Sequence, residues 1–176
     1  MASRLKDHQI RFLSYLNEQL KNEKRGVLAN LRRGLSYPPG EDMNMYRYVA
    51  GFIPDHERGS SKEKIYYLIA ALFAYHQIST EQGNFGNHMR NAIIEGNEDS
   101  TERRFTILLN AHFDELPDYL RQSVSYLKSK DVPINWQQLF EDLLYWDHPE
   151  RFVQRNWANS FWGYQVDEKN KQNEQS

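Results

Sequence analysis

The chain has 176 residues, no cysteine, 39% hydrophobic residues and 26% charged residues. This length and composition predict one globular domain or two small lobes, and they exclude collagen-like and highly charged disordered chains. The absence of cysteine excludes thiolate metal sites, iron–sulfur clusters, disulfide frameworks and cysteine nucleophiles. Because no disulfide framework and no apolar N-terminal run are present, we expect a cytoplasmic protein that does not associate with membranes.

Helical periodicity predicts an all-α protein of about eight helices. The first helix carries Leu13, Leu16 and Leu20, and the second carries Val27, Leu28, Leu31 and Leu35. Breaks are expected at residues 37–40 and 54–61, where proline, glycine and polar residues gather. A long helix follows, with an apolar stripe from Ile65 to His76, and Ser60 with Glu63 predicts a capping box at its start.

Four more helices are predicted in the second half of the chain, after breaks at residues 83–86 and 95–99. The first is capped by Ser100 and Thr101 and carries Phe105, Leu108 and Leu109. The next runs from Leu116 to Leu127, with Pro117 in its first turn. Asn135 is expected to cap a helix that begins at Trp136, and the last helix starts near Pro149.

No alternating strand pattern bounded by turn residues is present, so no sheet is predicted. The acidic break at 95–99 suggests an N-terminal lobe over 1–95 and a C-terminal helical bundle over 96–166. Residues 167–176 are entirely polar and are expected to form a disordered tail. Trp136 and Trp157 fall in register with apolar stripes and are assigned to core packing, with base stacking as the alternative role.

An enzymatic site is not predicted. None of the six histidines is paired with another at the i, i+4 helical spacing of a metal site, and phosphate-binding loops and nucleophile elbows are missing. Adjacent carboxylates such as Glu141 and Asp142 point in different directions on a helix, as expected for a solvated face. No metal and no cofactor are therefore expected.

The basic residues carry more information. Residues 1–34 hold eight Lys/Arg and three Asp/Glu, a balance of +5 in a chain whose net charge is −2. Arg25 and Arg32 lie together on one border of the apolar face of the second predicted helix, and Arg33 lies further round. Such a ridge suits phosphate contacts. Arginines that flank a core stripe and pair with carboxylates such as Glu102 explain the pattern equally well.

A similar arrangement occurs in the second half of the chain. Arg121 and Lys128 are seven residues apart and flank the core stripe of the 116–127 helix. Arg104 borders the apolar face of the preceding helix, whereas Arg103 points away from that face. These four residues are the second set of candidate phosphate ligands.

Six segments, taken in order, resemble the small subunit of type I-E CRISPR effector complexes, the CasB family of Cascade. Residues 25–34, RGVLANLRRG, resemble its opening motif, and Phe85-Gly86-Asn87 resembles its central glycine-containing segment. The other matches are ERRF with the two leucines at 102–109, LR at 120–121, INW to DLLYW at 134–146, and WANSFW at 157–162. Together the matches extend over about residues 10–164.

The resemblance implies a non-catalytic, all-α subunit that stabilises the guide RNA–target DNA heteroduplex and the displaced strand, the R-loop, in antiviral defence. Contacts would run to the backbone phosphates, because the guide reads the sequence. The implied partners are the guide RNA, the target DNA, the backbone and large subunits of Cascade, and a second copy of the chain. The matched basic residues are Arg25, Arg32, Arg33, Arg103, Arg104 and Arg121, and Lys62 corresponds to a basic residue that the family often has.

Two functions remain open at this point. The first is a nucleic-acid-binding subunit of a ribonucleoprotein. The second is a protein–protein scaffold in which the same arginines are structural and the partners contact the nucleic acid. A small nuclease is a distant third, because no acid–base or metal set is present.

Overall fold

The structure is a computed structural model and describes residues 4–163. The predicted all-α fold is confirmed: the described residues form nine α-helices, four short 3-10 helices, and no strand beyond a single bridge between Ser79 and Ile134. The α-helices are α1 (Asp7–Lys21), α2 (Arg25–Arg33), α3 (Tyr46–Val49), α4 (Ser61–Tyr75), α5 (Phe85–Asn91), α6 (Glu98–Asn110), α7 (Leu116–Ser129), α8 (Trp136–Leu144) and α9 (Phe152–Trp162). The 3-10 helices are η1 (Gly34–Ser36), η2 (Met43–Met45), η3 (Ala50–Phe52) and η4 (Asp55–Glu57). The tail predicted at 167–176 lies outside the described residues.

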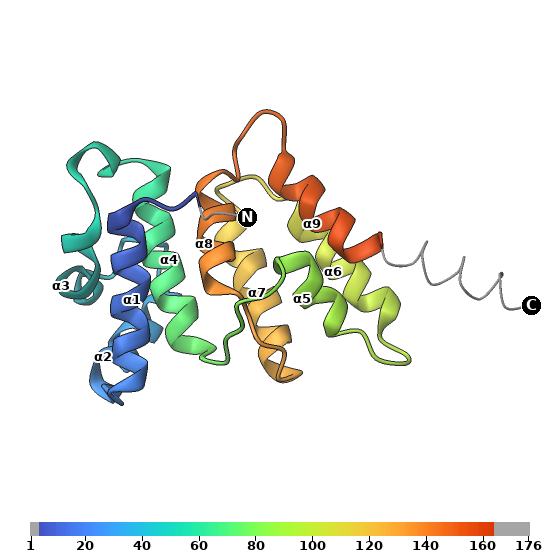
Figure 1. Cartoon of the computed structure of the whole chain (residues 1–176), viewed down its shortest axis with the longest axis horizontal. Coiled ribbons are helices and arrows are strands. Elements are labelled where there is room, and N and C mark those ends of the chain that lie inside the picture. Colours follow the sequence, from blue (N-terminus) through green and yellow to red (C-terminus); the bar gives the residue numbers. More distant parts are fainter. Residues whose placement is uncertain (1–3, 164–176) are drawn as a thin grey trace, which may run out of the picture.

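The helices form an elongated array (Figure 1). Helices α1 to α4 lie on one side, α5, α6 and α9 lie on the other, and α7 and α8 stand between them. Helix α4 packs against α2 and α8, α6 packs against α7, and α5 packs against α9. The division into lobes at residues 95 and 96 stays a prediction.

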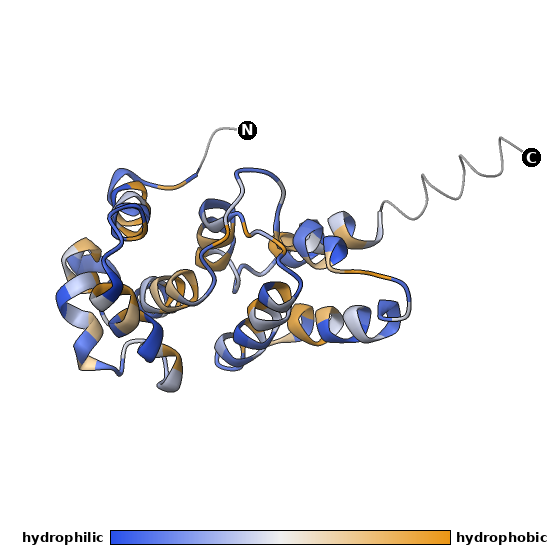
Figure 2. Ribbon diagram, turned by 90° about the horizontal axis from the view of Figure 1, so that it is seen from below, coloured by the Kyte–Doolittle hydropathy of each residue, from blue (hydrophilic) through white to orange (hydrophobic). Residues whose placement is uncertain are grey.

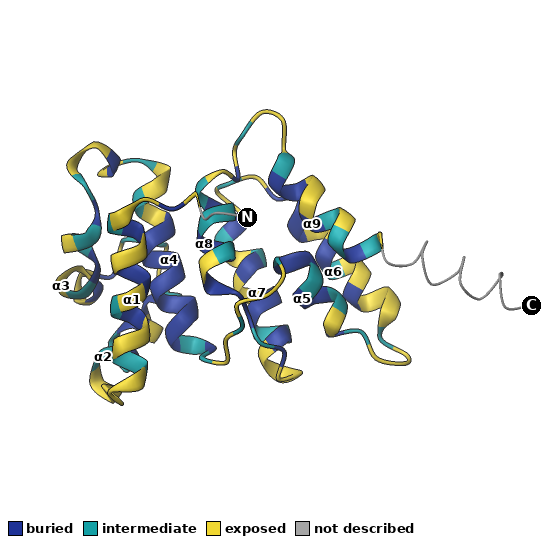
Figure 3. Cartoon of the chain, in the orientation of Figure 1, coloured by how far each residue is buried: buried dark blue, intermediate teal, exposed yellow. Residues whose placement is uncertain are grey.

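Helix α4 is the central element of the N-terminal side. Every residue from Ile65 to Ala74 is buried, which includes residues outside the predicted apolar stripe such as Tyr67 and Ala70. Figure 3 shows the resulting buried column between α1 and α8. A helix that is apolar all round is expected to be covered on all sides, and α4 is covered by α1, α2, α3, α7 and α8.

Aromatic side chains join α1, α4 and α8. The Phe12 ring lies 5.2 Å from that of Tyr66 and 5.6 Å from that of Phe140, and the Tyr66 and Phe140 rings are 5.1 Å apart. These tilted and edge-on geometries are the ones that aromatic pairs favour. Hydrophobic residues of the helices accordingly lie mainly where the helices face one another (Figure 2).

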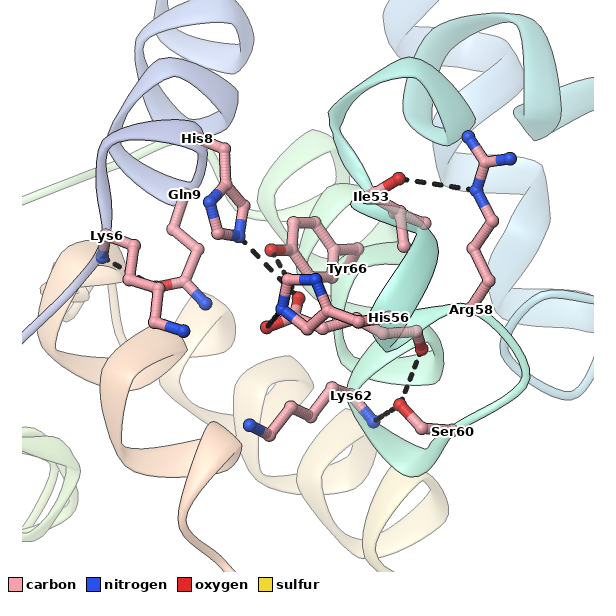
Figure 4. Close-up of polar contacts among 10 residues, drawn as sticks. Lys6, His8, Gln9, Ile53, His56, Arg58, Ser60, Lys62 and Tyr66 are labelled. Carbon is pink, nitrogen blue, oxygen red and sulfur yellow. Dashed lines mark hydrogen bonds and ion pairs between the residues drawn. The ribbon is translucent and has the colours of Figure 1, made fainter.

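The buried Glu57 carboxylate ties the 54–61 break to α1 and α4. Figure 4 shows its neighbours His8, His56 and Tyr66 gathered together. Glu57 is 2% exposed, and its Oε2 accepts a hydrogen bond of 3.0 Å from the Tyr66 hydroxyl. The Nε2 atoms of His8 and His56 lie 3.7 and 3.9 Å from its two oxygens. Burial, together with the hydrogen bond to Glu57, raises the pKa of Tyr66 and keeps its hydroxyl a donor.

Helices α5 and α9 approach so closely that one position requires glycine. A Cβ atom added to Gly86 on α5 would collide with the backbone oxygen of Trp157 on α9. The Trp157 side chain is completely buried, with its ring 5.0 Å from that of Phe85. Trp136 is 4% exposed, so the assignment of Trp136 and Trp157 to the core is confirmed.

Three of the predicted helix starts are confirmed, with one change of detail. The Ser60 side chain caps α4 by accepting from the backbone N–H of Lys62, but Glu63 bonds the N–H of Gly59 rather than that of Ser60. Asn135 caps α8 by accepting from the N–H of Gln138 at 3.1 Å. Pro117 lies in the first turn of α7, as predicted.

Four other boundaries differ from the predicted ones. Helix α6 begins at Glu98, so Ser100 and Thr101 lie within its first turn instead of capping it, and the Thr101 hydroxyl bonds Tyr126. Helix α9 begins at Phe152, because Arg151 adopts a left-handed conformation (φ 50°) and its guanidinium bonds the Leu109 carbonyl oxygen. The 83–86 break contains the start of α5, and Leu35 belongs to η1 rather than to α2.

One buried histidine shows how the core holds neutral polar groups. His88 is 2% exposed, and its Nε2 accepts from the backbone N–H of Asn135 at 3.1 Å. This bond places the ring proton on Nδ1, and burial lowers the pKa of His88 to about 4. His88 is therefore a structural residue that joins α5 to the cap of α8.

Candidate nucleic-acid interface

Helix α2 presents its arginines to solvent. Leu28 and Leu31 form its buried face, and Arg25, Arg32 and Arg33 are exposed. Arg33 donates a hydrogen bond of 3.3 Å to the Asn30 side chain, whereas the guanidinium groups of Arg25 and Arg32 contact no hydrogen-bond acceptor or carboxylate of the described residues. Seven residues separate Arg25 from Arg32, which is a rise of about 10 Å along the helix. The arginine ridge is thus held by a packed helix, and its exposed guanidinium groups are available to bind a ligand.

Two further cations extend this basic surface. Lys21 at the end of α1 and Lys24 just before α2 are both exposed beside the turn that leads to Arg25. They were not among the predicted site residues, although the charge balance of residues 1–34 contained the signal.

Lys62 lies in the first turn of α4. Only its backbone nitrogen is bonded, to the Ser60 hydroxyl at 3.2 Å (Figure 4). A cation at a helix N-terminus is unfavourable toward the helix dipole. The position of Lys62 therefore contributes nothing evident to the stability of α4.

Arg121 and Lys128 both bond to other elements of the fold. Arg121 donates to the Leu35 carbonyl oxygen at 2.8 Å, and Lys128 donates to the Tyr75 carbonyl oxygen at 2.5 Å with its Nζ 4.1 Å from the Tyr75 ring centroid. These bonds hold α7 against η1 and against the end of α4. Arg121 consequently lies next to the end of α2 rather than apart from the α2 ridge.

The surroundings of Arg121 disfavour a phosphate. A depression of about 290 Å³ beside it is lined by Leu35, Pro38 and Pro117, and also by the carboxylates Asp114 and Asp118. Two carboxylates and one guanidinium give this depression a negative balance. The structure therefore favours a tethering role for Arg121.

Arg103 and Arg104 lie on the side of α6 that borders α7. Arg103 is exposed, and Arg104 is half-buried with its guanidinium carbon 5.0 Å from the centroid of the Tyr126 ring. The predicted alternative of ion pairs with carboxylates such as Glu102 does not occur: within residues 4–163, none of the eight candidate cations lies within 4.0 Å of a carboxylate. Arg104 is instead held by an aromatic ring.

The candidates form two groups. Arg25, Arg32 and Arg33 share α2, with Arg121 near its end, and Arg103 with Arg104 lies on α6. Lys62 and Lys128 belong to neither group. Lys62 lies in the first turn of α4, and Lys128 is bonded to Tyr75 at the end of α4.

A larger hollow on the described surface has a different character. It measures about 990 Å³, lies beside α8, and is lined mainly by amide and hydroxyl side chains together with Glu81, Glu141, Asp142 and Arg4. Burial raises the pKa of Asp142 to about 6, although hydrogen bonds from Trp157 and Gln138 act in the opposite direction. Three carboxylates against one guanidinium make this hollow unsuitable for a polyanion.

Neither a metal-binding cluster nor a membrane-spanning helix is found in the part of the chain that the structure describes. Between residues 4 and 163, no group of three or more histidine, aspartate or glutamate side chains is arranged to hold a metal ion. No helix in the same range is long and apolar enough to cross a membrane.

Comparison with known proteins identifies relatives over nearly the whole chain. Residues 27–162 match the family described as CRISPR-associated protein Cse2. The chain is 33% identical over 168 residues to the CRISPR-associated protein Cse2 of Thermus thermophilus, which covers 93% of this chain and 95% of that protein.

Solved structures agree. The crystal structure of M. ruber CasB is 28% identical, covers 93% of this chain and 97% of its own, and has a TM-score of 0.77. A chain of a CRISPR RNA-guided surveillance complex in a pre-nicking state is 27% identical, with coverages of 94% and 97% and a TM-score of 0.78. The chain therefore belongs to the Cse2 family, whose members are also named CasB.

Proposed function

We propose that the chain is a non-catalytic, nucleic-acid-binding subunit of a cytoplasmic CRISPR RNA-guided surveillance complex. In this role it stabilises the guide RNA–target DNA heteroduplex and the displaced strand by binding backbone phosphates. Its partners are the guide RNA, the target DNA, the backbone and large subunits of the complex, and a second copy of itself.

One observation carries the proposal. Arg25, Arg32 and Arg33 share α2 and are exposed, without carboxylate partners in the described region. Guanidinium groups on a rigid helix suit bidentate contacts with phosphates, and such contacts position a nucleic acid without reading its sequence. The similarity to a chain of a surveillance complex supports the same assignment.

A purely structural scaffold is the second candidate, and specific contacts favour it for part of the site. Arg121 and Lys128 are bonded to backbone carbonyl oxygens. If the α2 arginines also served only the fold or the assembly, their removal would not change the salt dependence of nucleic-acid binding.

The test is the triple replacement of Arg25, Arg32 and Arg33 by alanine in the assembled complex. Target binding should weaken to a similar extent for unrelated sequences, because the lost contacts go to phosphates. The slope of log affinity against log salt should shrink by up to about 0.7–0.9 for each lost contact.

A matched control removes three other exposed cations: Arg11 on α1, Lys64 on α4 and Arg155 on α9. This variant changes the net charge by the same amount and should leave most of the salt slope unchanged. An unchanged slope in a folded α2 triple variant contradicts the proposal and favours the scaffold.

A further inference from the structure

A groove between α6 and α7 combines apolar side chains with two exposed or half-exposed arginines. Four side chains from successive turns of α6 line one wall, at spacings of three, one and three residues, and two from α7 line the other. The lining residues are Ser100, Arg103, Arg104, Ile107, Tyr119 and Gln122, and the groove measures about 270 Å³.

The groove has an apolar part and a cationic part. Ile107 is 42% exposed, and the half-buried Tyr119 ring faces the groove from α7. Arg103 and Arg104 supply two positive charges, and Ser100 and Gln122 supply hydrogen-bonding groups. Asp99 and Glu102 are on the same helix but do not line the groove, so its lining carries no carboxylate.

The position of Arg104 is fixed by its neighbours. Its guanidinium lies on Tyr126, whose hydroxyl accepts from the Asn97 side chain at 2.8 Å and also bonds Thr101. Contact with a ring face leaves the N–H donors of a guanidinium unused. Arg104 is therefore held at the groove with its donors available, beside the exposed Arg103.

We propose that this groove is a subsite for one unpaired nucleotide of the displaced strand. The base lies against Ile107 and Tyr119, with Ser100 and Gln122 at its edge, and the adjoining phosphate binds Arg103 and Arg104. Every base has a flat apolar face, so such a subsite accepts any sequence but requires an unpaired strand. This inference rests on the proposed function and adds a contact to bases that phosphate binding does not include.

The test uses the assembled complex with the full-length chain and target DNA whose displaced strand carries one abasic site, moved one position at a time. With the wild-type chain, an abasic site at the bound position should shorten the R-loop lifetime by roughly tenfold, because stacking of one base is lost. Abasic sites elsewhere should have little effect. Ile107→Ala should remove the sensitivity at that position, and Gln122→Glu, which places a carboxylate in the groove, should do the same.

Ile10→Ala is the matched control, because Ile10 on α1 is 43% exposed and lies far from the groove in the sequence. This variant should keep the abasic sensitivity. Arg103→Ala should shorten the R-loop lifetime by the same factor on an intact displaced strand and on a strand with an abasic site outside the groove. A phosphate contact does not depend on the base.

Several outcomes would overturn the subsite. The subsite is refuted if the wild-type complex shows no position that is sensitive to an abasic site. It is also refuted if Ile107→Ala and Gln122→Glu both keep that sensitivity. Loss of the subunit from the complex in folded Ile107→Ala would identify the groove as a protein-docking surface instead. Each of these results leaves the α2 triple variant and its salt slope as a separate measure of the proposed function.

Discussion

Asp142 is a residue whose ionisation works against folding. Its Oδ2 accepts from the Trp157 indole at 2.6 Å and its Oδ1 accepts from the Gln138 amide at 2.9 Å. Burial nevertheless raises its pKa from 3.8 to about 6. The charged form is therefore penalised at neutral pH, and the stabilising contribution of the protonated form is fully present below pH 3.8 and lost as the pH rises through 6.

The stability of Asp142→Asn relative to the wild type should increase with pH, because asparagine has no charge to bury. From pH 4 to pH 8, the difference in free energy of unfolding between variant and wild type should move in favour of the variant by up to about 3 kcal/mol. Urea unfolding at pH 4, 6 and 8 measures this change. Asp147→Asn, at an exposed carboxylate in the following loop, is the control for the loss of one negative charge. A pH-independent difference for Asp142→Asn would contradict the prediction.

At the scale of elements, the fold depends on how closely helices can approach. Helices α5 and α9 meet at Gly86 and Trp157, and a side chain at residue 86 would collide with backbone rather than with a movable side chain. The same interface contains Arg90, whose guanidinium donates to the Phe161 carbonyl oxygen at 3.1 Å near the end of α9.

Gly86→Ala should lower the free energy of unfolding by about 1–3 kcal/mol or more, because the two helices must separate to admit one methyl group. Gly26→Ala is the control. Gly26 lies in α2 with nothing within 4 Å of an added Cβ atom. This control should stabilise α2 by about 0.5–1 kcal/mol, since alanine favours the helix. Thermal and urea unfolding of both variants test the pair, and a Gly86→Ala protein as stable as wild type would mean that the α5–α9 contact yields easily.

At the scale of the whole molecule, the proposed function is a bias in an equilibrium between closed and opened target DNA. Exchange of about 20 base pairs of DNA for RNA–DNA heteroduplex is close to balanced in free energy. A subunit that binds the opened strands contributes only to the open state. A few kcal/mol from the α2 ridge and the α6–α7 groove are therefore enough to determine the lifetime of the R-loop.

Omission of this subunit should leave guide RNA loading nearly intact while R-loops on relaxed DNA collapse faster. Negative supercoiling should partly restore their lifetime, because it supplies the same bias toward opening. Single-molecule measurement of R-loop lifetime with and without the subunit, on relaxed and supercoiled targets, distinguishes these effects. Full lifetime on relaxed DNA without the subunit would refute the stabilising role.

The sequence by itself determined the fold class, most helices and the family. Apolar spacing of three and four residues marks a buried helix face wherever the partner lies, so Trp136 and Trp157 could be assigned to the core without knowing their neighbours. The arginine ridge on α2 was also predictable, because the relative positions of side chains on one helix follow from the helix geometry alone.

The tertiary structure decided which cations are available. Arg121 and Lys128 resemble Arg25 and Arg32 in the sequence, since each pair is seven residues apart beside a core stripe. The carbonyl oxygens of Leu35 and Tyr75 that engage Arg121 and Lys128 lie 86 and 53 residues away. The α6–α7 groove and the approach at Gly86 likewise depend on which helices meet. Local spacing fixes the face of a helix, whereas only packing fixes what that face meets.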